Sequence, residues 1–201
     1  MTDRSRPPRP DEGRSRVGRP RAPEADRAIL EATLEMVAEA GYEGVRVNEV
    51  AERAGVAKTT MYRRWSRKPE LVLAALWSAP ELPDVDTGDL RTDLVTLMSH
   101  FLALAERIPL VELLASLAAE RQRDPELALE LDPYVAERTR PILRALQRAV
   151  ARGEVAADAD LELASSMFGG AVVIRLLFGG STSQATIERL ADRVVASIEP
   201  A

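Results

Sequence analysis

The chain has 201 residues, of which 46% are hydrophobic and 4% aromatic, a composition typical of alanine- and leucine-rich helical proteins. Disulfides and thiolate metal sites are excluded because there is no cysteine, and His100 is the single histidine. No stretch approaches the roughly 18 consecutive apolar residues of a membrane span, and the N-terminus lacks a signal-peptide core. We therefore expect a soluble, cytoplasmic protein with no metal, no cofactor and no membrane partner.

The net charge of −5 is distributed unevenly along the chain. Residues 1–68 carry 15 Lys and Arg against 11 Asp and Glu, whereas the remaining residues carry 12 against 21. The basic part can approach phosphates while the acidic part is repelled by them, and this asymmetry would orient the protein on a nucleic-acid duplex.

Residues 1–23 are rich in Arg, Pro and Gly and contain almost no large apolar side chain, which predicts a disordered basic arm. The run Gly-Arg-Pro-Arg at 18–21 is similar to the core of an arm that reads the DNA minor groove, with Arg19 and Arg21 entering the groove. A solubilising tail with non-specific affinity for phosphate is an equally good interpretation.

The spacing of small, apolar and basic residues over 48–65 is typical of a helix-turn-helix. Val50, Ala51 and Ala54 form an apolar stripe on a short first helix, and Ala51 is small enough for a second helix to cross closely. Gly55 stands where the chain must turn, and glycine readily adopts the positive φ that such a turn requires. The alternative to a DNA-reading motif is a tight helical hairpin whose basic face is merely exposed to solvent.

The second helix of this motif buries Met61 and Trp65, which are one turn apart, and exposes its polar residues. Hydroxyls and methyls suit base edges in the major groove, whereas cations suit phosphates. Thr59 and Thr60 are therefore expected to control sequence choice. The DNA contacts that we predict in and around the motif are Arg46, Lys58, Thr59, Thr60, Tyr62, Arg63 and Lys68.

A dense set of positions extends this pattern from the preceding helix to the following one: Leu34, Ala38, Gly41-Tyr42, Val47, Ala51, Ala54-Gly55-Val56, Lys58, Tyr62, Trp65, Lys68 and Leu71. Together, residues 25–76 resemble the N-terminal domain of the TetR/AcrR family of bacterial transcriptional regulators. Arg46 departs from the Ser or Thr that usually caps the first motif helix, so either Asn48 caps it or Arg46 reaches a phosphate.

Arg67 is a second departure, because the family often has Ser, Asp or Asn there. Ser66 is then the better cap of the fourth helix, and Pro69 fits its first turn. The resemblance implies an all-α fold with a three-helix helix-turn-helix domain over 24–79. Residues 80–201 would form a C-terminal helical bundle for ligand binding and dimerisation. The sequences at 123–127 and 149–154 are also similar to the C-terminal domains of this family, although this similarity is weaker than that of the N-terminal domain.

The prolines, glycine and acids of residues 79–88 predict a linker. Periodicity and capping residues then predict further helices, divided at Asp132-Pro133 and either kinked or broken at Pro141. In chain order these helices are expected at 89–108, 109–123, 124–131, 134–152, 161–178 and 187–198.

The helix expected at 161–178 is apolar on all sides, so it must be covered on all sides. A partner subunit is the natural cover, with Val173, Leu177, Ile187 and Val194 in a two-fold interface formed by the last two helices of each chain. The alternative is a central core helix of a monomer. Two consecutive glycines, Gly169 and Gly170, indicate a close helix crossing or a local break.

An effector pocket is expected between the linker helix and the dimer helices. Its apolar candidates are Phe101, Leu104, Leu114, Leu117, Tyr134, Leu143 and Met167, and its polar candidates are His100, Arg121 and Arg175. For each apolar residue a place in the plain core is the commoner role. The low aromatic content favours an aliphatic or mixed ligand over a flat, stacked one.

No set of nucleophile, histidine and acid can be assembled, and no glycine-rich phosphate loop follows a strand, so we do not expect an enzyme. We predict a homodimeric repressor that binds a palindromic double-stranded DNA operator and is released by a small-molecule effector. The alternative is an architectural or constitutive DNA-binding protein without an effector, which has no need for a separate acidic domain of more than a hundred residues.

Overall fold

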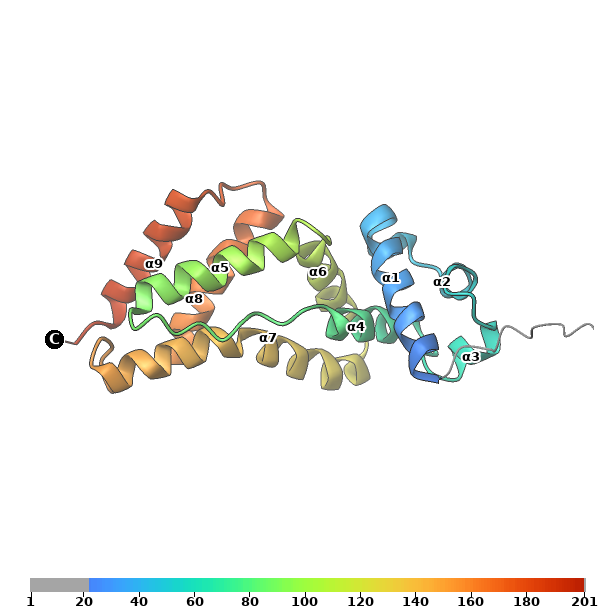
Figure 1. Cartoon of the computed structure of the whole chain (residues 1–201), viewed down its shortest axis with the longest axis horizontal. Helices are drawn as coiled ribbons and strands as arrows, with labels where there is room; N and C mark the ends of the chain where they lie inside the picture. The colour runs from blue at the N-terminus through green and yellow to red at the C-terminus, as the bar shows by residue number, and fades with distance from the viewer. Residues whose placement is uncertain (1–21, 201) are drawn as a thin grey trace, which may run out of the picture.

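The computed structural model describes residues 22–200, and the predicted arm residues Arg19 and Arg21 lie outside this range. Within it the chain forms nine helices and no strand, which confirms the all-α fold (Figure 1). The helices are α1 (Ala22–Gly44), α2 (Val47–Arg53), α3 (Lys58–Tyr62), α4 (Lys68–Ser78), α5 (Leu90–Ala105), α6 (Leu110–Arg121), α7 (Pro125–Arg152), α8 (Leu161–Leu177) and α9 (Gln184–Ile198). None of these is long and apolar enough to cross a membrane.

Helices α2 and α3 form the predicted helix-turn-helix. Val50 and Ala51 of α2 and Met61 of α3 are fully buried, as their spacing requires. Gly55 has a φ of +66° between the two helices, so the glycine supplies the left-handed turn that the motif needs. Helix α3 is short, because its helical turns end at Tyr62 rather than continuing to Trp65.

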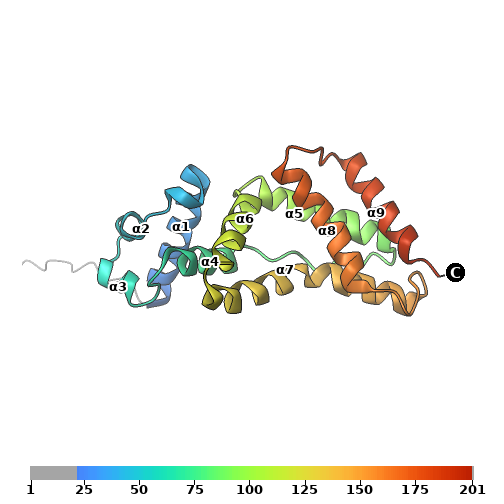
Figure 2. The same cartoon turned by 180° about the vertical axis from the view of Figure 1, so that it is seen from behind.

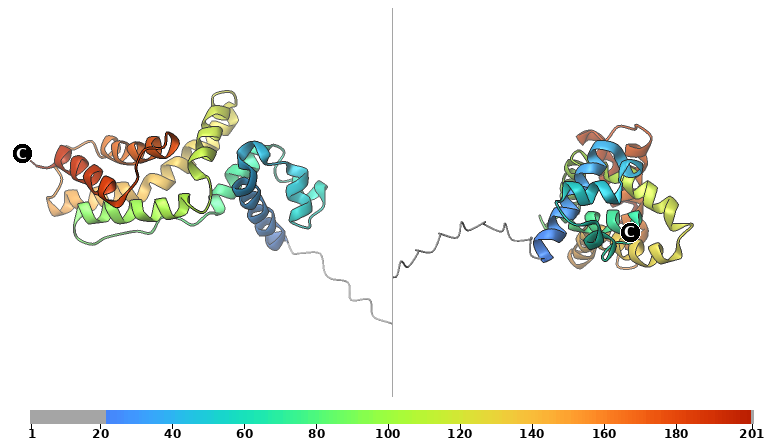
Figure 3. Two further views of the ribbon diagram at one scale, coloured as in Figure 1. Left: turned by 90° about the horizontal axis from the view of Figure 1, so that it is seen from above. Right: turned by 90° about the vertical axis from the view of Figure 1, so that its right-hand side faces the viewer.

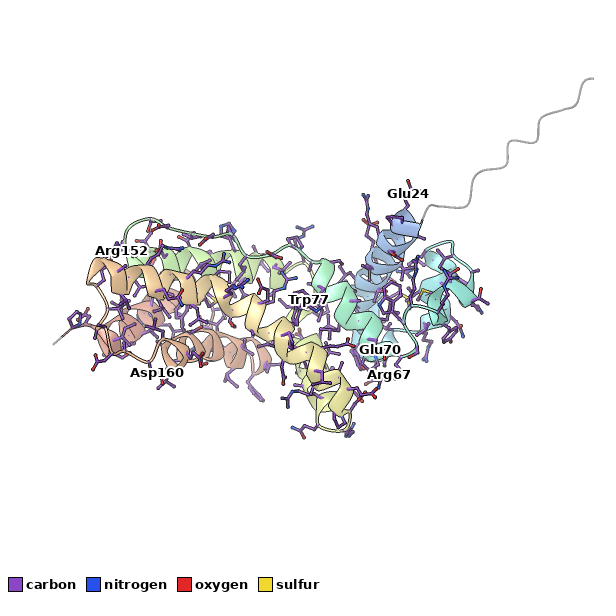
Figure 4. All side chains as sticks on the ribbon, turned by 90° about the horizontal axis from the view of Figure 1, so that it is seen from below. Glu24, Arg67, Glu70, Trp77, Arg152 and Asp160 are labelled. Atoms are coloured by element: carbon purple, nitrogen blue, oxygen red, sulfur yellow. The ribbon has the colours of Figure 1, made fainter. Side chains whose placement is uncertain are left out.

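Helix α4 begins differently from the prediction. Arg67, not Ser66, occupies the N-cap, and the capping oxygens come from Glu70. The backbone N–H groups of Ser66 and Arg67 donate to Glu70 Oε2 at 3.1 and 3.3 Å, so the N3 carboxylate accepts from the N-cap amide as in a capping box (Figure 4). Pro69 lies in the first turn, as expected.

Helix α7 corrects the prediction of two helices at 124–131 and 134–152. It is one helix that contains Pro133 and Pro141, and its ribbon bends along its course (Figure 4). A proline removes one helical hydrogen bond and bends the chain, but packing can hold both sides of the bend together. Leu131 and Tyr134 are buried on either side of Pro133, so the same core anchors both parts of the helix.

The buried side chains form two cores, and their boundary differs from that between the two predicted domains. The first core joins α1–α4 to α6 and the first half of α7, and the second joins α5, the second half of α7, α8 and α9. The molecule is therefore elongated, with α1–α3 at one end and α8–α9 at the other (Figures 2 and 3). Helix α7 is shared by both cores, because Tyr134 belongs to the first and Ile142 to the second.

The segment between α4 and α5 runs beside α7 (Figure 1). Two acids of this segment pair with arginines of α7: Asp84 lies 2.9 Å from Arg148, and Asp86 lies 3.3 Å from Arg152. The predicted linker is thus fastened along the helix that spans both cores.

Helix α8 is continuous through its glycine pair, so the expected local break is absent from it. A Cβ added at Gly169 or Gly170 would meet nothing within 4 Å in this chain, so no close helix crossing within the chain requires them. The glycines instead leave open space beside α8.

We expect Gly170→Ala to raise the free energy of unfolding by about 0.5–1 kcal/mol, because alanine is the better helix former and its methyl group has room. The matched change Gly55→Ala should lower it by about 1–2 kcal/mol, because Gly55 has a positive φ. Urea unfolding of both variants at one protein concentration measures the difference. A destabilising Gly170→Ala would contradict the open space beside α8.

Candidate functional site

The predicted DNA contacts at the start of the helix-turn-helix are exposed. Arg46 is the N-cap residue of α2, and its guanidinium lies 3.7 Å from Glu49. Lys58 begins α3, and its ammonium lies 3.3 Å from Glu52 at the end of α2. These ion pairs are solvent-exposed and weak, so both cations can exchange a carboxylate for a phosphate.

The remaining residues of α3 have different exposures. Thr59 is exposed, whereas Thr60 is half-buried. Tyr62 is exposed, and its hydroxyl donates to Asn48 Oδ1 at 3.3 Å, which connects α3 to α2. Arg63 is exposed at the end of α3 and has no ion pair within residues 22–200. The short helix therefore presents a hydroxyl, a phenol and cations to solvent.

Lys68 is less exposed than the other predicted contacts. Its ammonium lies 3.3 Å from the carbonyl oxygen of Tyr42, 3.2 Å from the Glu43 carboxylate and 4.1 Å from the centre of the Tyr42 ring. Burial, with the nearby carboxylates of Glu120 and Glu43, raises the pKa of Tyr42 to about 12, so this phenol is neutral. Lys68 thus fastens the start of α4 to the end of α1.

Two arginines that the sequence analysis did not single out hold α1 against the motif. Arg53 makes a bidentate pair with Glu39 at 2.7 and 2.8 Å, and these hydrogen bonds lower the pKa of that carboxyl. Arg64 pairs with Asp26 near the start of α1. Their partners are distant in sequence, so spacing within the motif gave no signal for them.

A cavity of about 600 Å³ lies between the two cores, within the size range of small-molecule sites. Its walls come from α5, α6, α7, α8 and the segment after α4. The residues that line it are Pro80, Leu82, Leu97, Met98, Phe101, Leu104, Leu110, Leu114, Tyr134, Val135, Ala136, Arg138, Thr139, Ile142, Leu143, Glu162, Ser165, Ser166, Gly169, Gly170 and Val173. The glycine pair of α8 therefore contributes volume to this cavity.

Five of the apolar residues predicted for an effector pocket line this cavity: Phe101, Leu104, Leu114, Tyr134 and Leu143. Leu117 instead belongs to the first core and is fully buried. Met167 lies on another face of α8, where it is 47% exposed to solvent. The helical period explains the difference, because neighbouring apolar positions on one helix face different directions.

None of the three predicted polar anchors lines the cavity. His100 is exposed on α5, one position before the lining residue Phe101. Arg121 makes a bidentate pair with Asp132 at 2.7 Å, and Arg175 donates to the carbonyl oxygen of Ser181 at 3.4 Å. Both guanidinium groups are therefore directed to partners outside the cavity.

Arg138 is the cationic residue that lines the cavity, and the sequence did not predict it. Its Nη1 donates to the carbonyl oxygen of Pro80 at 2.9 Å, and its Nη2 donates to those of Leu76 at 2.8 Å and Ala79 at 2.9 Å. A longer bond of 3.4 Å reaches Trp77. Arg138 thus binds the carbonyls at the end of α4, and no sequence pattern could reveal it because its partners are backbone atoms.

Two aromatic rings reinforce the contact between α4 and α7. Trp77 of α4, labelled in Figure 4, packs edge-on against Tyr134 with ring centres 5.0 Å apart, and the Arg138 guanidinium lies 5.2 Å from the centre of the Tyr134 ring. Burial raises the pKa of Tyr134, so its phenol is neutral in the cavity wall. The end of α4 and the cavity wall are therefore parts of one packed unit.

The other end of α4 is also bound to α7. Arg67 pairs with Asp124, the N-cap of α7, and lies 2.7 Å from Glu70 (Figure 4). Burial alone would raise the pKa of Glu70, but hydrogen bonds from Arg67 and Ser66 outweigh it and lower that pKa. Helix α7 thus contacts both the beginning and the end of α4.

Helix α8 exposes an apolar stripe, so in this chain it is not buried on all sides. The exposed members are Leu163 (56%), Met167 (47%), Ile174 (57%), Leu177 (37%) and Phe178 (80%). Of the predicted interface residues, Leu177 lies on this stripe and Val173 lines the cavity. Ile187 and Val194 are 1% and 4% exposed, because the inward face of α9 packs into the second core, which leaves them no surface for a partner.

Comparisons with known proteins identify the class of protein that this architecture defines. Residues 29–75 match the family model for bacterial regulatory proteins of the tetR family, and residues 84–194 match the tetracyclin repressor-like C-terminal domain. The DNA-binding transcriptional repressor TetR of Mycobacteroides abscessus is 36% identical over 172 residues, which cover 84% of this chain and 90% of that protein.

A further relative, the HTH-type transcriptional regulator YdeS of Bacillus subtilis, is 31% identical over 83% of this chain and 85% of its own length. The crystal structure of the TetR family transcription regulator SCO0332 superposes with a TM-score of 0.71 at 28% identity, covering 88% of this chain and all of that one. This chain belongs to the TetR family and is a DNA-binding transcriptional regulator.

Proposed function

We propose that the chain is a homodimeric repressor that binds a palindromic operator and is released by a small molecule in the cavity between its two cores. The observation that carries this proposal is the position of the cavity, because its wall includes Tyr134 and Arg138, which hold the end of α4. A molecule bound there contacts Tyr134 and Arg138, which in turn contact α4, the helix that leads into the DNA-binding domain. The arm residues Arg19 and Arg21 are proposed as additional minor-groove contacts.

The apolar stripe on α8 supports a homodimer. Isolated apolar residues are common on protein surfaces, but a stripe that follows one helix face is typical of an interaction site. A second copy of the chain presents the same stripe and can cover it in a two-fold arrangement. Two DNA-binding heads would then face successive major grooves, about one helical turn apart.

The mechanism follows from this geometry. Ligand that binds better when α4 is displaced shifts the population toward that state. Displaced α4 helices alter the separation of the two heads, so the heads no longer match the groove repeat and the affinity for the operator falls.

The cavity also argues against an architectural DNA-binding protein. An apolar cavity reduces stability, because the lining side chains lose packing contacts. A protein without an effector gains nothing that would offset this cost.

Sequencing the DNA fragments that the purified protein selects from its own genome tests the proposal. A repressor should select a small set of palindromic sites upstream of genes, and it should retain them at salt concentrations that remove random duplex. Equal affinity for selected and random duplex at high salt would establish the architectural alternative instead.

Substitutions in and near α3 should separate the residues that read sequence from those that bind phosphate. We expect Thr60→Ala to change the preferred bases, whereas Arg63→Ala and Lys68→Ala should weaken all sequences alike and lower the log–log salt slope by about 1 each. Fluorescence anisotropy with selected duplexes at several salt concentrations measures both effects.

Arg63 provides the matched control for Lys68. Lys68 also fastens α4 to α1, so its removal should lower the melting temperature as well, whereas removal of the exposed Arg63 should not. An unchanged salt slope in Lys68→Ala, together with reduced stability, would show that this lysine is structural and not a phosphate contact.

Dimerisation can be tested on the stripe of α8. Ile174→Arg should give folded monomers, because it places a charge where the partner's apolar side chains pack. Operator affinity should fall by orders of magnitude, since one head loses the second half-site. Ala151→Arg, at an exposed position of α7, is the control. Light scattering and circular dichroism on a dilution series measure both states, and a wild-type protein that stays monomeric when concentrated would refute the dimer.

A further inference from the structure

Arg138 differs from the other arginines of α7 in the charge that surrounds it. Arg140, Arg144, Arg148 and Arg152 each have a carboxylate within 4.0 Å. For Arg138 no carboxylate lies within that distance in the part of the chain that the structure describes, and its hydrogen-bond partners are neutral groups, namely backbone carbonyls and the Tyr134 phenol. It is the uncompensated cation of this helix.

The environment of Arg138 makes this lack of a counter-ion significant. The side chain is half-buried and lines an otherwise largely apolar cavity wall, and its Nε is buried without a hydrogen-bond partner within residues 22–200. A cation removed from water and left without an opposite charge is costly, and an anion that reaches it recovers part of that cost.

On this basis we propose that the cavity binds an aliphatic carboxylic acid, whose carboxylate takes the Arg138 guanidinium away from the carbonyls at the end of α4. The acyl chain occupies the aliphatic wall formed by residues such as Leu97, Leu104 and Leu143. A carboxylate is a stronger partner for a guanidinium than a neutral carbonyl, and it can accept two parallel hydrogen bonds.

The same exchange links ligand binding to the DNA-binding domain. Arg138 supplies a positive charge at the C-terminal end of α4, where a cation stabilises the helix dipole and satisfies the last carbonyls. Loss of this cation frees the end of α4, while Arg67 still holds its beginning to Asp124. The inference therefore deepens the proposed function and rests on it.

The second charged residue in the wall is Glu162, which has no ion pair within the described residues. A carboxylate at this position repels an acid and attracts a cation. If Glu162 governed the cavity, an aliphatic amine would bind best. Probes with one chain length and three head groups distinguish these cases.

The experiment measures the binding of decanoate, decan-1-ol and decylammonium to the full-length protein by calorimetry. Decanoate should bind at least about tenfold more tightly than decan-1-ol, as expected for hydrogen bonds to a charged group. Decanoate should also release the operator duplex selected by the wild-type protein, as followed by fluorescence anisotropy.

Three variants assign the effect to one side chain. Arg138→Met should reduce decanoate affinity to that of decan-1-ol, leave decan-1-ol binding unchanged and weaken operator binding without any ligand. Arg138→Lys should retain part of the preference for the acid, and it decides the matter if Arg138→Met does not fold. Arg140→Met, whose side chain pairs with Glu137 at 2.5 Å, should change neither affinity.

Several results would overturn the inference. These are equal affinity of the wild-type protein for acid and alcohol, an unchanged preference for decanoate in Arg138→Met, or decanoate binding that leaves the operator bound. Tight binding of decylammonium that Glu162→Gln abolishes would assign the cavity to cations. Failure of the ligand-free wild-type protein to bind any duplex would instead contradict the proposed repressor function.

Discussion

The arrangement of the chain depends on the hydrogen bonds that Arg138 donates to the backbone carbonyls at the end of α4. A helix that ends without such partners leaves its last carbonyls to water, and α4 ends against α7 rather than in open solvent. A side chain of α7 thus completes the helix that joins the DNA-binding domain to the rest of the chain.

Helix α7 can perform this task because it belongs to both hydrophobic cores. Its two prolines bend it without ending it, so Tyr134 packs with the DNA-binding helices and Ile142 packs with α8 and α9. The cavity lies where the two cores meet, so the proposed ligand would act on their boundary rather than deep in either core. Packed cores resist small deformations, so such a boundary is where two arrangements can have similar energies.

The sequence predicted the features that depend on local spacing. The turn at Gly55, the burial of Met61 and the all-α fold follow from period and from glycine's conformational freedom. It did not predict the continuity of α7, because tertiary packing on both sides of Pro133 decides whether a proline bends or ends a helix. Nor did it predict Arg138, whose partners are carbonyls 58 to 62 residues away, or the inward direction of Ile187 and Val194.

The separation of the two DNA-binding heads in the proposed dimer tests the central claim most directly. The chain has no cysteine, so Ala38→Cys, at an exposed position of α1, provides a site for one spin label per subunit. Double electron–electron resonance spectroscopy then measures the distance between the two labels in the dimer. Decanoate should shift or broaden the ligand-free distance distribution, and Arg138→Met should produce the same change without decanoate. An unchanged distribution in the decanoate-saturated protein would contradict the coupling of the cavity to α4.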